Sequence, residues 1–524
     1  MAAAVPDLRI AREDAETLVT GATVRAQSVQ RGDLFAGVPG MTTHGARFVG
    51  DAAGRGAVAV LTDPDGAALL AGPDGARLLP PQGLPVVVHE DPRHVLGPVA
   101  AVVYGDPSTR FTLVGITGTS GKTTTSYLVD AALGAAGNTT GLVGTVGTRI
   151  AGEVIATSLT TPEGSALQGL FAVMVERGVT AAVMEVSSHA LDQNRAGGTR
   201  FAVGAFTNLS QDHLDYHPTI EDYFQAKSRL FVPVEPGDPV CAHAVICVDD
   251  DWGRRMADLR RAAGLPLSTV ATNSPTDASA ADWTTGDVVV AADGSQSFTL
   301  TGPGGTADVT IALPGRYNVA NAALALAVAH AAGADLAAAA AGVALVAVPG
   351  RVQRIDRGQD FLAVVDYAHK PAAVEAVIAT LRAQTPGRIG IVVGAGGDRD
   401  RGKRPLMGAA AARGAELVVV TDDNPRTEEP GAIRAAVLDG ARAAVAAGEG
   451  RGGGEVREVG DRRAAIAAAV AWARPGDVVL IAGKGHEPGQ EIAGVKHPFD
   501  DRDELARAID ARLRGSVDAG PDRA

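Results

Sequence analysis

The sequence predicts an α/β protein of three domains: a small N-terminal α/β domain, a central domain with a mostly parallel sheet, and a C-terminal Rossmann-like domain. Three observations lead to this prediction. The chain has 524 residues, enough for roughly two to four domains. Short apolar runs alternate with helical patterns over residues 108–349 and again over residues 350–510, as in βαβ units. A glycine-broken loop joins the first of these runs to a helical pattern.

The charge balance limits the partners that the protein can have. The formal net charge is -13, from 47 Lys and Arg against 60 Asp and Glu. Such an acidic chain is a poor candidate for a general nucleic-acid or anionic-membrane surface. No run approaches the roughly 18 uncharged apolar residues of a membrane span, and the N-terminus lacks the basic stretch and long apolar core of a signal peptide. We expect small-molecule substrates, no nucleic acid, no membrane span, a cytoplasmic location and a monomer.

Residues 1–107 are predicted to form the small N-terminal domain. Gly32-Asp33 is typical of a turn before a strand, a helical stretch begins at Gly45, and the apolar run Gly56–Leu61 indicates a buried strand. The segment Gly105–Ser108, with Asp-Pro at its centre, is the expected linker to the next domain.

The stretch T-L-V-G-I-T-G-T-S-G-K-T-T-T (112–125) organises the central domain. Its apolar run ends in glycines, and Lys122-Thr123 then opens a helical pattern. Glycines let backbone N–H groups approach phosphate oxygens, while a lysine and a hydroxyl reach the terminal phosphates and Mg²⁺. A full Walker A would need glycine at Ile116, and Gly115 makes the loop one residue longer. The pattern predicts a P-loop ATPase domain; the alternative is a glycine-rich turn before an ordinary helix.

Polar residues follow further apolar runs in the same way. Glu185 and Asn208 in the central domain, and Asp366 beyond it, each stand directly after such a run. Ligands of open α/β sheets lie outside the carboxyl ends of the strands, so we expect these residues to share one site. Glu185 is a natural Mg²⁺ ligand opposite a P-loop; the alternative is a helix N-cap or a surface acid.

Two more segments of the central domain carry candidate residues. N-L-S-Q-D-H-L-D-Y-H (208–217) contains two histidines and two aspartates without a zinc spacing. His213 is the candidate for a metal or phosphate, whereas His217, before Pro218, is expected to be structural. Lys227 lies in Y-F-Q-A-K-S-R-L-F, a predicted amphipathic helix, where composition alone predicts a solvated surface charge.

The rest of the central domain changes character. From Trp283 to Leu313, short alternating strands with Asp-Gly and Gly-Gly turns predict an antiparallel meander at one sheet edge. The alanine-rich segment 320–348 is predicted to be helical, and Pro349-Gly350 marks the next boundary. Arg351, at that boundary, can reach across a cleft to a phosphate.

Residues 350–524 restart the alternation and predict the Rossmann-like domain. Apolar runs at Ile389–Val393, Leu417–Thr421 and Val478–Ala482 each end in a polar motif, namely G-A-G-G-D-R-D-R-G-K-R-P, D-D-N-P-R and G-K-G-H-E. Residues 515–524 are expected to form a frayed tail.

These three motifs place cations at the ends of strands. Solvated surface charge is the alternative, but in an acidic chain we favour an anionic small molecule. Asn424, Arg426 and Glu487 together offer a carboxylate clamp and an acceptor for an ammonium group, which suits an amino acid with more than one charged end. The cations are Arg399, Lys403, Arg404, Arg426 and Lys484.

Taken in order, the motifs resemble the Mur ligase family over essentially the whole chain. After the P-loop come L-T-T-P (159–162), M-E-V-S-S-H-A-L, N-L-S-Q-D-H-L-D-Y-H, A-K-S-R-L-F, N-V-A-N (318–321), V-P-G-R (348–351), V-D-Y-A-H, G-G-D-R-D, D-N-P-R and G-K-G-H-E. The resemblance implies a UDP-substrate-binding N-terminal domain (1–107), a central ATP-binding domain (108–349) and a C-terminal amino-acid-binding domain (350–524). It is greatest to members that add diaminopimelate to UDP-N-acetylmuramoyl-L-alanyl-D-glutamate in peptidoglycan synthesis.

The resemblance implies ADP-forming amide-bond formation with ATP and Mg²⁺. ATP would phosphorylate the D-glutamate γ-carboxylate, and the diaminopimelate amine would displace phosphate from the acyl phosphate. Lys122, Glu185, His213 and Lys227 would be catalytic. The metal would be held by Thr123, Glu185, His213 and Lys227, the last as a carbamate. The residues implied for ATP are Gly118, Thr119, Ser120, Gly121, Lys122, Thr123, Thr124, Asn208, Asn318, Arg351 and Asp366. Those implied for the UDP-substrate are Ser28, Thr160, Thr161, Ser187 and Arg195. Those implied for diaminopimelate are Arg399, Asp423, Asn424, Pro425, Arg426, Gly483 and Glu487.

The chain departs from the family pattern at a few positions. Arg25-Ala26-Gln27 stands where Asp-Ser-Arg is usual, Ser120 where asparagine is commoner, Lys370 where threonine is common, and Ala395 where cysteine is frequent. D-N-P-R and G-K-G-H-E argue against a folylpolyglutamate synthetase-like or lysine-adding ligase. A regulatory P-loop NTPase is the alternative from another class, and it would leave the C-terminal cations without a role. The meso and LL forms of diaminopimelate carry the same charges, so the sequence does not distinguish them.

Overall fold

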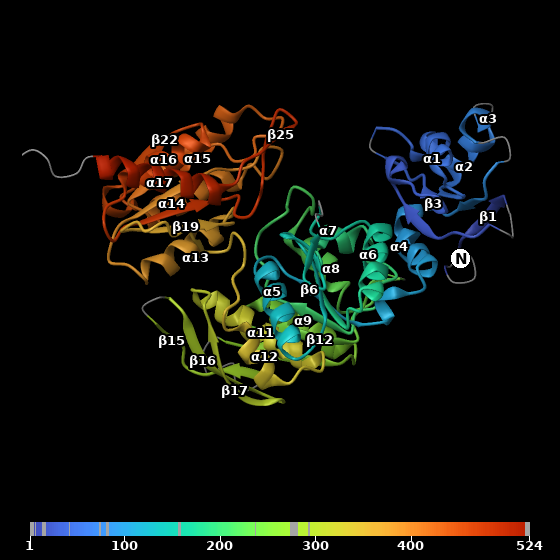
Figure 1. The fold of residues 1–524 in the computed structure, drawn as a ribbon, viewed down its shortest axis with the longest axis horizontal. Coiled ribbons are helices and arrows are strands. Elements are labelled where there is room, and N and C mark those ends of the chain that lie inside the picture. The colour runs from blue at the N-terminus through green and yellow to red at the C-terminus, as the bar shows by residue number, and fades with distance from the viewer. Residues whose placement is uncertain are drawn as a thin grey trace, which may run out of the picture.

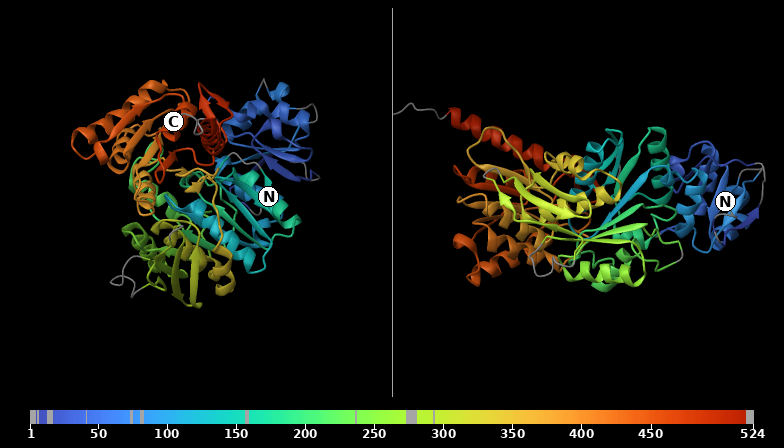
Figure 2. Two further views of the ribbon diagram at one scale, coloured as in Figure 1. Left: turned by 60° about the vertical axis from the view of Figure 1, so that its left-hand side comes forward. Right: turned by 90° about the horizontal axis from the view of Figure 1, so that it is seen from below.

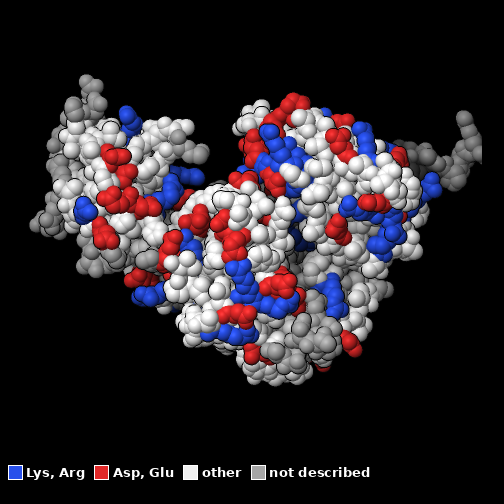
Figure 3. Space-filling view, turned by 180° about the vertical axis from the view of Figure 1, so that it is seen from behind, with Lys and Arg blue, Asp and Glu red and all other residues white. Residues whose placement is uncertain are grey.

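The computed structural model describes residues 5, 7–12, 17–40, 42–72, 75–79, 83–155, 159–235, 237–272, 281–291 and 294–518. These residues form three α/β domains, each around its own sheet (Figure 1). The right-hand view of Figure 2 shows the central domain between the other two. The space-filling view in Figure 3 shows an open notch between the first domain and the third. The predicted fold class, with three domains and mostly parallel sheets, is confirmed.

The N-terminal sheet has the strand order β1-β5-β4-β3-β2. Strands β2 to β5 are parallel, and β1 pairs antiparallel with β5 at the edge. Every residue of β3 and β4 is buried, as their apolar sequences predict. The elements are β1 (Arg9–Arg12), β2 (Gly21–Thr23), η1 (Ala26–Ser28), β3 (Asp33–Ala36), η2 (Gly45–Phe48), α1 (Val49–Arg55), β4 (Ala59–Thr62), α2 (Pro64–Ala71), α3 (Gly75–Leu78), β5 (Val86–Val88) and α4 (Pro92–Val103).

The central sheet has the order β15-β16-β14-β13-β12-β11-β6-β10-β7-β8-β9, with β17 beside β16. From β7 to β14 in this order the strands are parallel, and antiparallel strands extend both edges. The meander predicted after Trp283 is confirmed, although its first strand, β14, runs parallel to β13. The strands are β6 (Thr112–Thr117), β7 (Thr140–Gly144), β8 (Gly147–Ile150), β9 (Glu153–Ile155), β10 (Ala181–Glu185), β11 (Val203–Phe206), β12 (His243–Cys247), β13 (Leu267–Ala271), β14 (Trp283–Thr285), β15 (Val289–Val290), β16 (Gln296–Gly302) and β17 (Gly305–Ile311).

Helices cover both faces of the central sheet. The segment 320–348, predicted to be helical, is helical in two parts. It forms two helices, α11 and α12, because the chain turns at Gly333 with a φ of 93°. No helix among the described residues has the length and hydropathy that a membrane crossing requires. The helices of this domain are η3 (Pro107–Thr109), α5 (Lys122–Ala135), α6 (Gly164–Glu176), α7 (Ser188–Asp192), α8 (Ile220–Ser228), α9 (Asp251–Ala262), α11 (Arg316–Ala331) and α12 (Leu336–Val343).

The C-terminal sheet has the order β18-β19-β23-β20-β21-β22, with β19 to β22 in this order parallel. The frayed tail predicted from Gly515 is wrong for residues 515–518, which continue α17; residues 519–524 lie outside the described residues. The elements are β18 (Gln353–Arg354), β19 (Leu362–Asp366), α13 (Pro371–Arg382), β20 (Ile389–Val393), α14 (Lys403–Gly414), β21 (Leu417–Val420), α15 (Pro430–Ala446), η4 (Arg451–Gly453), β22 (Glu455–Glu458), α16 (Arg462–Trp472), β23 (Val478–Ala482), β24 (Gln490–Ile492), β25 (Val495–His497) and α17 (Asp501–Asp518).

The first domain packs against the second where α4 meets α6 and the loop after α7. An ideal Cβ on Gly97 would lie 2.3 Å from the carbonyl oxygen of Gly197, so the two backbones are in contact. The side-chain amide of Asn194 donates to the carbonyl oxygen of His94 at 2.9 Å across the same interface. Small residues therefore set the spacing of the two domains.

We expect Gly97→Ala to lower the thermal midpoint of unfolding, because the added methyl group must displace the backbone of Gly197, and overpacking costs about 1–3 kcal/mol. Gly54→Ala in α1 is the matched control, since nothing lies within 4 Å of its ideal Cβ and alanine favours a helix by about 1 kcal/mol over glycine. Scanning calorimetry of both variants measures the midpoints. A Gly97→Ala midpoint at or above that of the unmodified protein would contradict the close approach.

Candidate active site

The turn between β6 and α5 forms the floor of the site. Gly118 and Gly121 have φ values of 144° and 88°, which favour glycine. The loop is tied to the end of β11, because the N–H of Thr119 donates to the carbonyl oxygen of Asn208 at 2.9 Å. Helix α5 begins at Lys122 without a side-chain cap. Its first N–H groups therefore remain for a ligand, and this is the geometry of a phosphate-binding loop.

Glu185, the last residue of β10, is fixed beside the first turn of α5. Its carboxylate accepts from the hydroxyl of Thr123 (3.0 Å), the N–H of Thr145 (2.8 Å) and the hydroxyl of Thr145 (3.1 Å). The residue is 1% exposed. The alternative of an N-cap or surface acid is wrong, since Ser187 caps the following helix.

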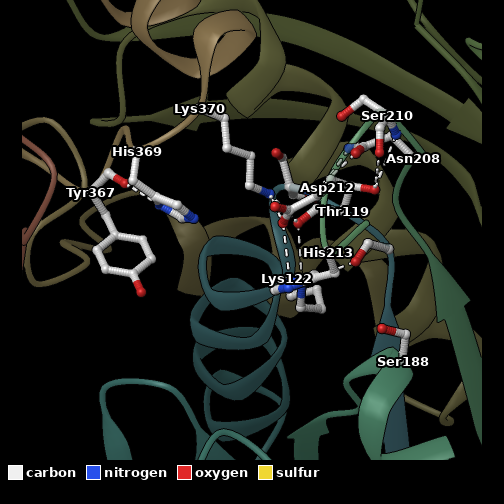
Figure 4. A network of polar contacts seen from close by, with 12 residues as sticks. Thr119, Lys122, Ser188, Asn208, Ser210, Asp212, His213, Tyr367, His369 and Lys370 are labelled. Carbon is white, nitrogen blue, oxygen red and sulfur yellow. Dashed lines mark hydrogen bonds and ion pairs between the residues drawn. The ribbon is translucent and has the colours of Figure 1, made fainter. Parts of the chain in front are cut away.

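Three lysine ammonium groups gather at the carbonyl oxygens of the P-loop. Lys122 Nζ donates to the carbonyl oxygens of Gly118 (2.9 Å) and Thr119 (3.1 Å), and Lys227 Nζ donates to Gly118 (2.8 Å). Lys370 reaches in from the C-terminal domain to 3.5 Å from the carbonyl oxygen of Thr119 (Figure 4). Lys227 is 1% exposed, so the expectation of a surface charge is wrong.

Burial and mutual repulsion set the charges of this cluster. Burial, together with Lys370, lowers the pKa of Lys122 to about 8, and the pKa of Lys227 lies well below its usual value for the same reasons. Burial opposes ionisation of Asp212, but the ammonium group of Lys370, 2.6 Å away, holds the pKa of that carboxyl below its usual value. Burial lowers the pKa of His213 to about 2, so its imidazole is neutral, with Nε2 3.1 Å from Asp212.

The C-terminal domain closes the site from the opposite side. Arg351 Nη2 donates to the hydroxyl of Thr123 at 3.2 Å, and its guanidinium carbon lies 4.2 Å from the ring centre of Tyr367. His486 Nε2 lies 3.1 Å from the carbonyl oxygen of Thr145. Within the part of the chain that the structure describes, Arg351 Nη1 is buried without a hydrogen-bond partner. A phosphate oxygen would satisfy it.

Asp366 shapes the segment that carries the C-terminal contacts. Its two carboxylate oxygens accept from the N–H groups of Val352 (2.7 Å) and Ala368 (2.8 Å). It therefore fixes the turn after β19 and the chain just beyond Arg351. This bracing differs from the ATP contact that the family resemblance implies for Asp366, although the residue still lines the cavity.

These groups line one cavity of about 1350 Å³ between the central and C-terminal domains. Gly118 and Lys227 do not line the cavity themselves, and they are joined to each other by a hydrogen bond. The sequence-predicted residues that line it are Thr119, Ser120, Gly121, Lys122, Thr123, Thr124, Thr160, Thr161, Glu185, Ser187, Arg195, Asn208, His213, Asn318, Arg351, Asp366 and Arg399. Those that do not are Ser28, Asp423, Asn424, Pro425, Arg426, Gly483 and Glu487.

A second polar cluster lies at the strand ends of the C-terminal domain. Lys484 is fully buried, and its Nζ donates to Asn424 Oδ1 (2.9 Å) and lies 3.2 Å from Glu487 Oε2. Asn424 in turn donates to Glu487 at 2.9 Å. Arg426 has a φ of 53° and donates to the carbonyl oxygen of Gly397 at 2.6 Å. Of the three predicted clamp residues, Asn424 and Glu487 contact each other and the buried Lys484, whereas Arg426 is held separately by Gly397.

The predicted group of five C-terminal cations is only partly assembled. Arg404 is buried and paired with Glu428 at 2.8 Å, which neutralises it. The side chain of Arg399 is 55% exposed, and its Nη1 lies 4.0 Å from Oδ2 of Asp215 in the central domain. Arg404 therefore braces the domain and is not available to an anion, contrary to expectation.

The oxygen donors near the P-loop fit Mg²⁺. The hydroxyl of Thr123 and the carboxylate of Glu185 are hard ligands, which Mg²⁺ prefers. No group of three or more His, Cys, Asp or Glu side chains among the described residues is placed to hold a metal. A bound Mg²⁺ would therefore draw most of its ligands from phosphate and water, as is usual for this ion. In the hydrogen bond between Lys227 and Gly118, the amine of Lys227 is the donor.

Sequence reasoning did not single out several residues that meet here. Asp212 directly precedes the candidate His213, and His486 lies inside G-K-G-H-E. Both belong to motifs from which other residues were predicted to form the site. Lys370 was visible only as a departure from a family pattern. Thr145, which carries three of the contacts around Glu185 and His486, has no sequence signal.

The fold and the site define a class of protein. A P-loop beside a buried carboxylate, with excess cations and a second Rossmann-like domain closing the cavity, is suited to nucleotide-dependent group transfer. Residues 116–329 match the Mur ligase middle domain, and residues 350–485 match the Mur ligase, glutamate ligase domain.

Relatives extend this match over the whole chain. A Corynebacterium efficiens protein named UDP-N-acetylmuramoyl-L-alanyl-D-glutamate--2,6-diaminopimelate ligase is 55% identical over 92% of this chain and 88% of its own length. A Streptomyces coelicolor protein of the same name is 50% identical over 96% and 94%. The chain belongs to the Mur ligase family and is an ATP-dependent, ADP-forming ligase.

Solved structures agree with this fold. A structure titled UDP-N-acetylmuramoyl-L-alanyl-D-glutamate--2,6-diaminopimelate ligase is 34% identical, with a TM-score of 0.62 over 94% of this chain and 95% of that one. The Thermotoga maritima MurF ligase in complex with ADP is 17% identical, with a TM-score of 0.64 over 96% and 100%, which shows a shared fold.

The lowered pKa of Lys122 predicts a pH dependence of nucleotide binding. Because its pKa is about 8, the empty protein loses this ammonium charge at a pH where an ordinary lysine keeps it, and a neutral amine cannot pair with phosphate. If binding requires the charged form, ATP affinity should be about tenfold weaker at pH 9 than at pH 7.

Isothermal titration with a non-hydrolysable ATP analogue at the two pH values measures this difference. In Lys122→Arg the guanidinium does not titrate in this range, so the difference should shrink. An unmodified protein that binds equally well at both pH values would contradict the assignment.

Proposed function

We propose that the protein adds diaminopimelate to UDP-N-acetylmuramoyl-L-alanyl-D-glutamate, forming an amide bond at the D-glutamate γ-carboxylate in peptidoglycan precursor synthesis. The observation that supports the proposal is the polar cluster in which Asn424 donates to Glu487 and buried Lys484 contacts both, with Arg426 two residues along the chain from Asn424. An arginine and an amide beside a carboxylate match an amino acid with a second charged end. The names of the relatives at 50–55% identity agree with it.

The first step would be phosphoryl transfer at the P-loop. A γ-carboxylate oxygen of the substrate attacks the terminal phosphorus of ATP, the bond to the bridging oxygen breaks, and ADP and an acyl phosphate result. Lys122 and Arg351 face the charge that spreads over the phosphoryl oxygens. Thr123 and Glu185 would hold Mg²⁺, which neutralises phosphate charge when bound. His213 and a carbamate on Lys227 stay predictions as further ligands.

The second step would be amide formation. The amine of diaminopimelate attacks the acyl carbon, the carbon–oxygen bond to phosphate breaks, and a proton passes to solvent. A carboxylate is a poor electrophile, and phosphorylation gives it a leaving group. Thr160, Thr161, Ser187 and Arg195 are the proposed contacts of the muramoyl-peptide, because they line the cavity beside Glu185. Ser28 stays a weaker prediction for the uridine end.

The division of labour among the domains is also part of the proposal. Residues 1–107 would bind the UDP moiety, residues 108–349 ATP, and residues 350–524 the amino acid, with Arg399, Asp423, Pro425 and Gly483 completing the diaminopimelate site. ATP as a co-substrate favours the cytoplasm as the location. The monomeric state stays a prediction.

ADP release by the purified protein with ATP, Mg²⁺ and UDP-N-acetylmuramoyl-L-alanyl-D-glutamate tests the proposal. We expect release to depend on diaminopimelate and to yield the tripeptide by mass spectrometry, with lysine a very poor replacement. The meso and LL isomers are tested side by side. ADP release that ignores both co-substrates would contradict a ligase and favour a regulatory NTPase.

Arg426→Met gives the same assay a specific control. Loss of the arginine removes the pair with the distal carboxylate, which lysine lacks, so kcat/KM for diaminopimelate should fall roughly 30-fold or more, and the preference over lysine should shrink. Arg442→Met, on an exposed position of α15, should leave both values unchanged. A preference that survives in Arg426→Met would assign specificity elsewhere.

A further inference from the structure

Lys370 comes from the C-terminal domain, yet its ammonium group lies at the P-loop of the central domain. It follows Asp366, whose carboxylate braces the turn after β19, and it immediately precedes Pro371, the first residue of α13. Its side chain is 10% exposed, and Nζ lies 2.6 Å from Asp212 and 3.5 Å from the carbonyl oxygen of Thr119. Figure 4 shows the side chain directed toward Lys122 and Asp212.

The P-loop carbonyls connect Lys370 to the groups that bind phosphate. The carbonyl oxygen of Thr119 lies within 3.1 Å of Lys122 Nζ as well, so the two ammonium groups approach the same peptide. Lys122 is the P-loop lysine, whose place is at the terminal phosphates of a nucleotide. Lys370 lines the same cavity. An ammonium group has three donors, and the two contacts of Lys370 leave one for a ligand.

The charge of the cluster favours an anion. Lys122 and Lys370 both approach the carbonyl oxygen of Thr119, and Asp212 is the carboxylate that pairs with Lys370. Arg351 adds a third cation, and its Nη1 is buried without a hydrogen-bond partner among the described residues. Closely spaced like charges are unfavourable in a buried site, and a phosphate group among them relieves the repulsion.

We propose that Lys370 contacts the terminal phosphoryl group of ATP, so that the phosphoryl-transfer site is complete only while the C-terminal domain is docked on the P-loop. Asp212 orients the ammonium group in the absence of nucleotide. This contact would tie the chemistry to the domain that carries the amino-acid clamp, which limits transfer of the phosphoryl group to water. The inference rests on ATP use by the enzyme and not on the identity of the amino acid.

Nucleotide binding to the full chain tests the inference, with Mg²⁺ and either ADP or the β,γ-imido analogue of ATP in isothermal titration. In Lys370→Met we expect the analogue to bind about tenfold or more weakly, because a hydrogen bond to a charged group is lost. ADP lacks the contacted group, so its affinity should stay within about twofold. Lys370→Arg, which keeps the charge, should restore part of the preference for the analogue.

Matched variants separate this contact from a structural role. Lys370→Met leaves the buried carboxylate of Asp212 without its ammonium partner, so the double variant Lys370→Met/Asp212→Asn removes both charges together. It should show the same selective loss, whereas Asp212→Asn alone should not. Lys496→Met removes an exposed lysine on β25 of the same domain that does not line the cavity, and it should leave the ratio of the two affinities unchanged.

The outcomes are decisive for the inference. Equal losses for both nucleotides, or no loss for either, would overturn the phosphoryl contact and reduce Lys370 to a link between domains. The measurement requires neither the muramoyl-peptide nor diaminopimelate. Failure of the ligase assay would therefore leave this result standing, and failure here would leave the proposed ligation untouched.

Discussion

The turn between β6 and α5 is the constraint on which the candidate site depends. Two glycines with positive φ allow the chain to enter α5 with its first N–H groups uncapped. The same turn points the carbonyl oxygens of Gly118 and Thr119 at lysines from three separate elements. One short loop thus provides donors for a phosphate and acceptors that make buried ammonium groups tolerable. Substitution at either glycine would disturb both functions together.

Contacts across the seam between the second and third domains join the P-loop region to the C-terminal domain. Arg351 reaches Thr123, Lys370 reaches Asp212, and His486 reaches Thr145. His486 directly precedes Glu487, a proposed diaminopimelate contact, while Thr145 holds the carboxylate of Glu185 next to the P-loop. Hydrogen bonds from His486 to Thr145 and from Thr145 to Glu185, together with the peptide bond between His486 and Glu487, therefore connect the two clusters. Such a network can transmit docking of one domain to the geometry of the other.

The sequence predicted the parts of this arrangement that depend on local pattern. Parallel strands buried on both faces are continuous apolar runs, so β6, β10, β20 and β23 were found together with the polar residues at their ends. Those ends converge at one edge of a parallel sheet, which is why Glu185 and the P-loop were expected to meet. The break at Gly333 was missed because the surrounding alanines carry little periodic signal, and the helical residues 515–518 were missed because G-S-V-D has a low intrinsic helix propensity.

Contacts between domains could not be predicted in the same way. The burial of Lys227 depends on the angle at which α8 packs against the P-loop, and composition alone predicts a surface charge. Arg404 was expected to bind an anion, because the sequence does not reveal its partner. That partner, Glu428, lies 24 residues away. Lys370 meets Asp212 only after two domains dock. Each of these contacts joins residues whose separation in sequence gives no pattern to detect.

The transfer of a carboxylate oxygen from the muramoyl-dipeptide to the released phosphate tests the account most directly. The muramoyl-dipeptide is prepared with ¹⁸O in both γ-carboxylate oxygens of D-glutamate, and the inorganic phosphate formed during ligation is examined by ³¹P NMR. An acyl phosphate formed at the P-loop predicts that one ¹⁸O atom appears in each phosphate released, because the carboxylate oxygen leaves with phosphorus. Phosphate without the label, formed while the tripeptide accumulates, would contradict the mechanism assigned to this site.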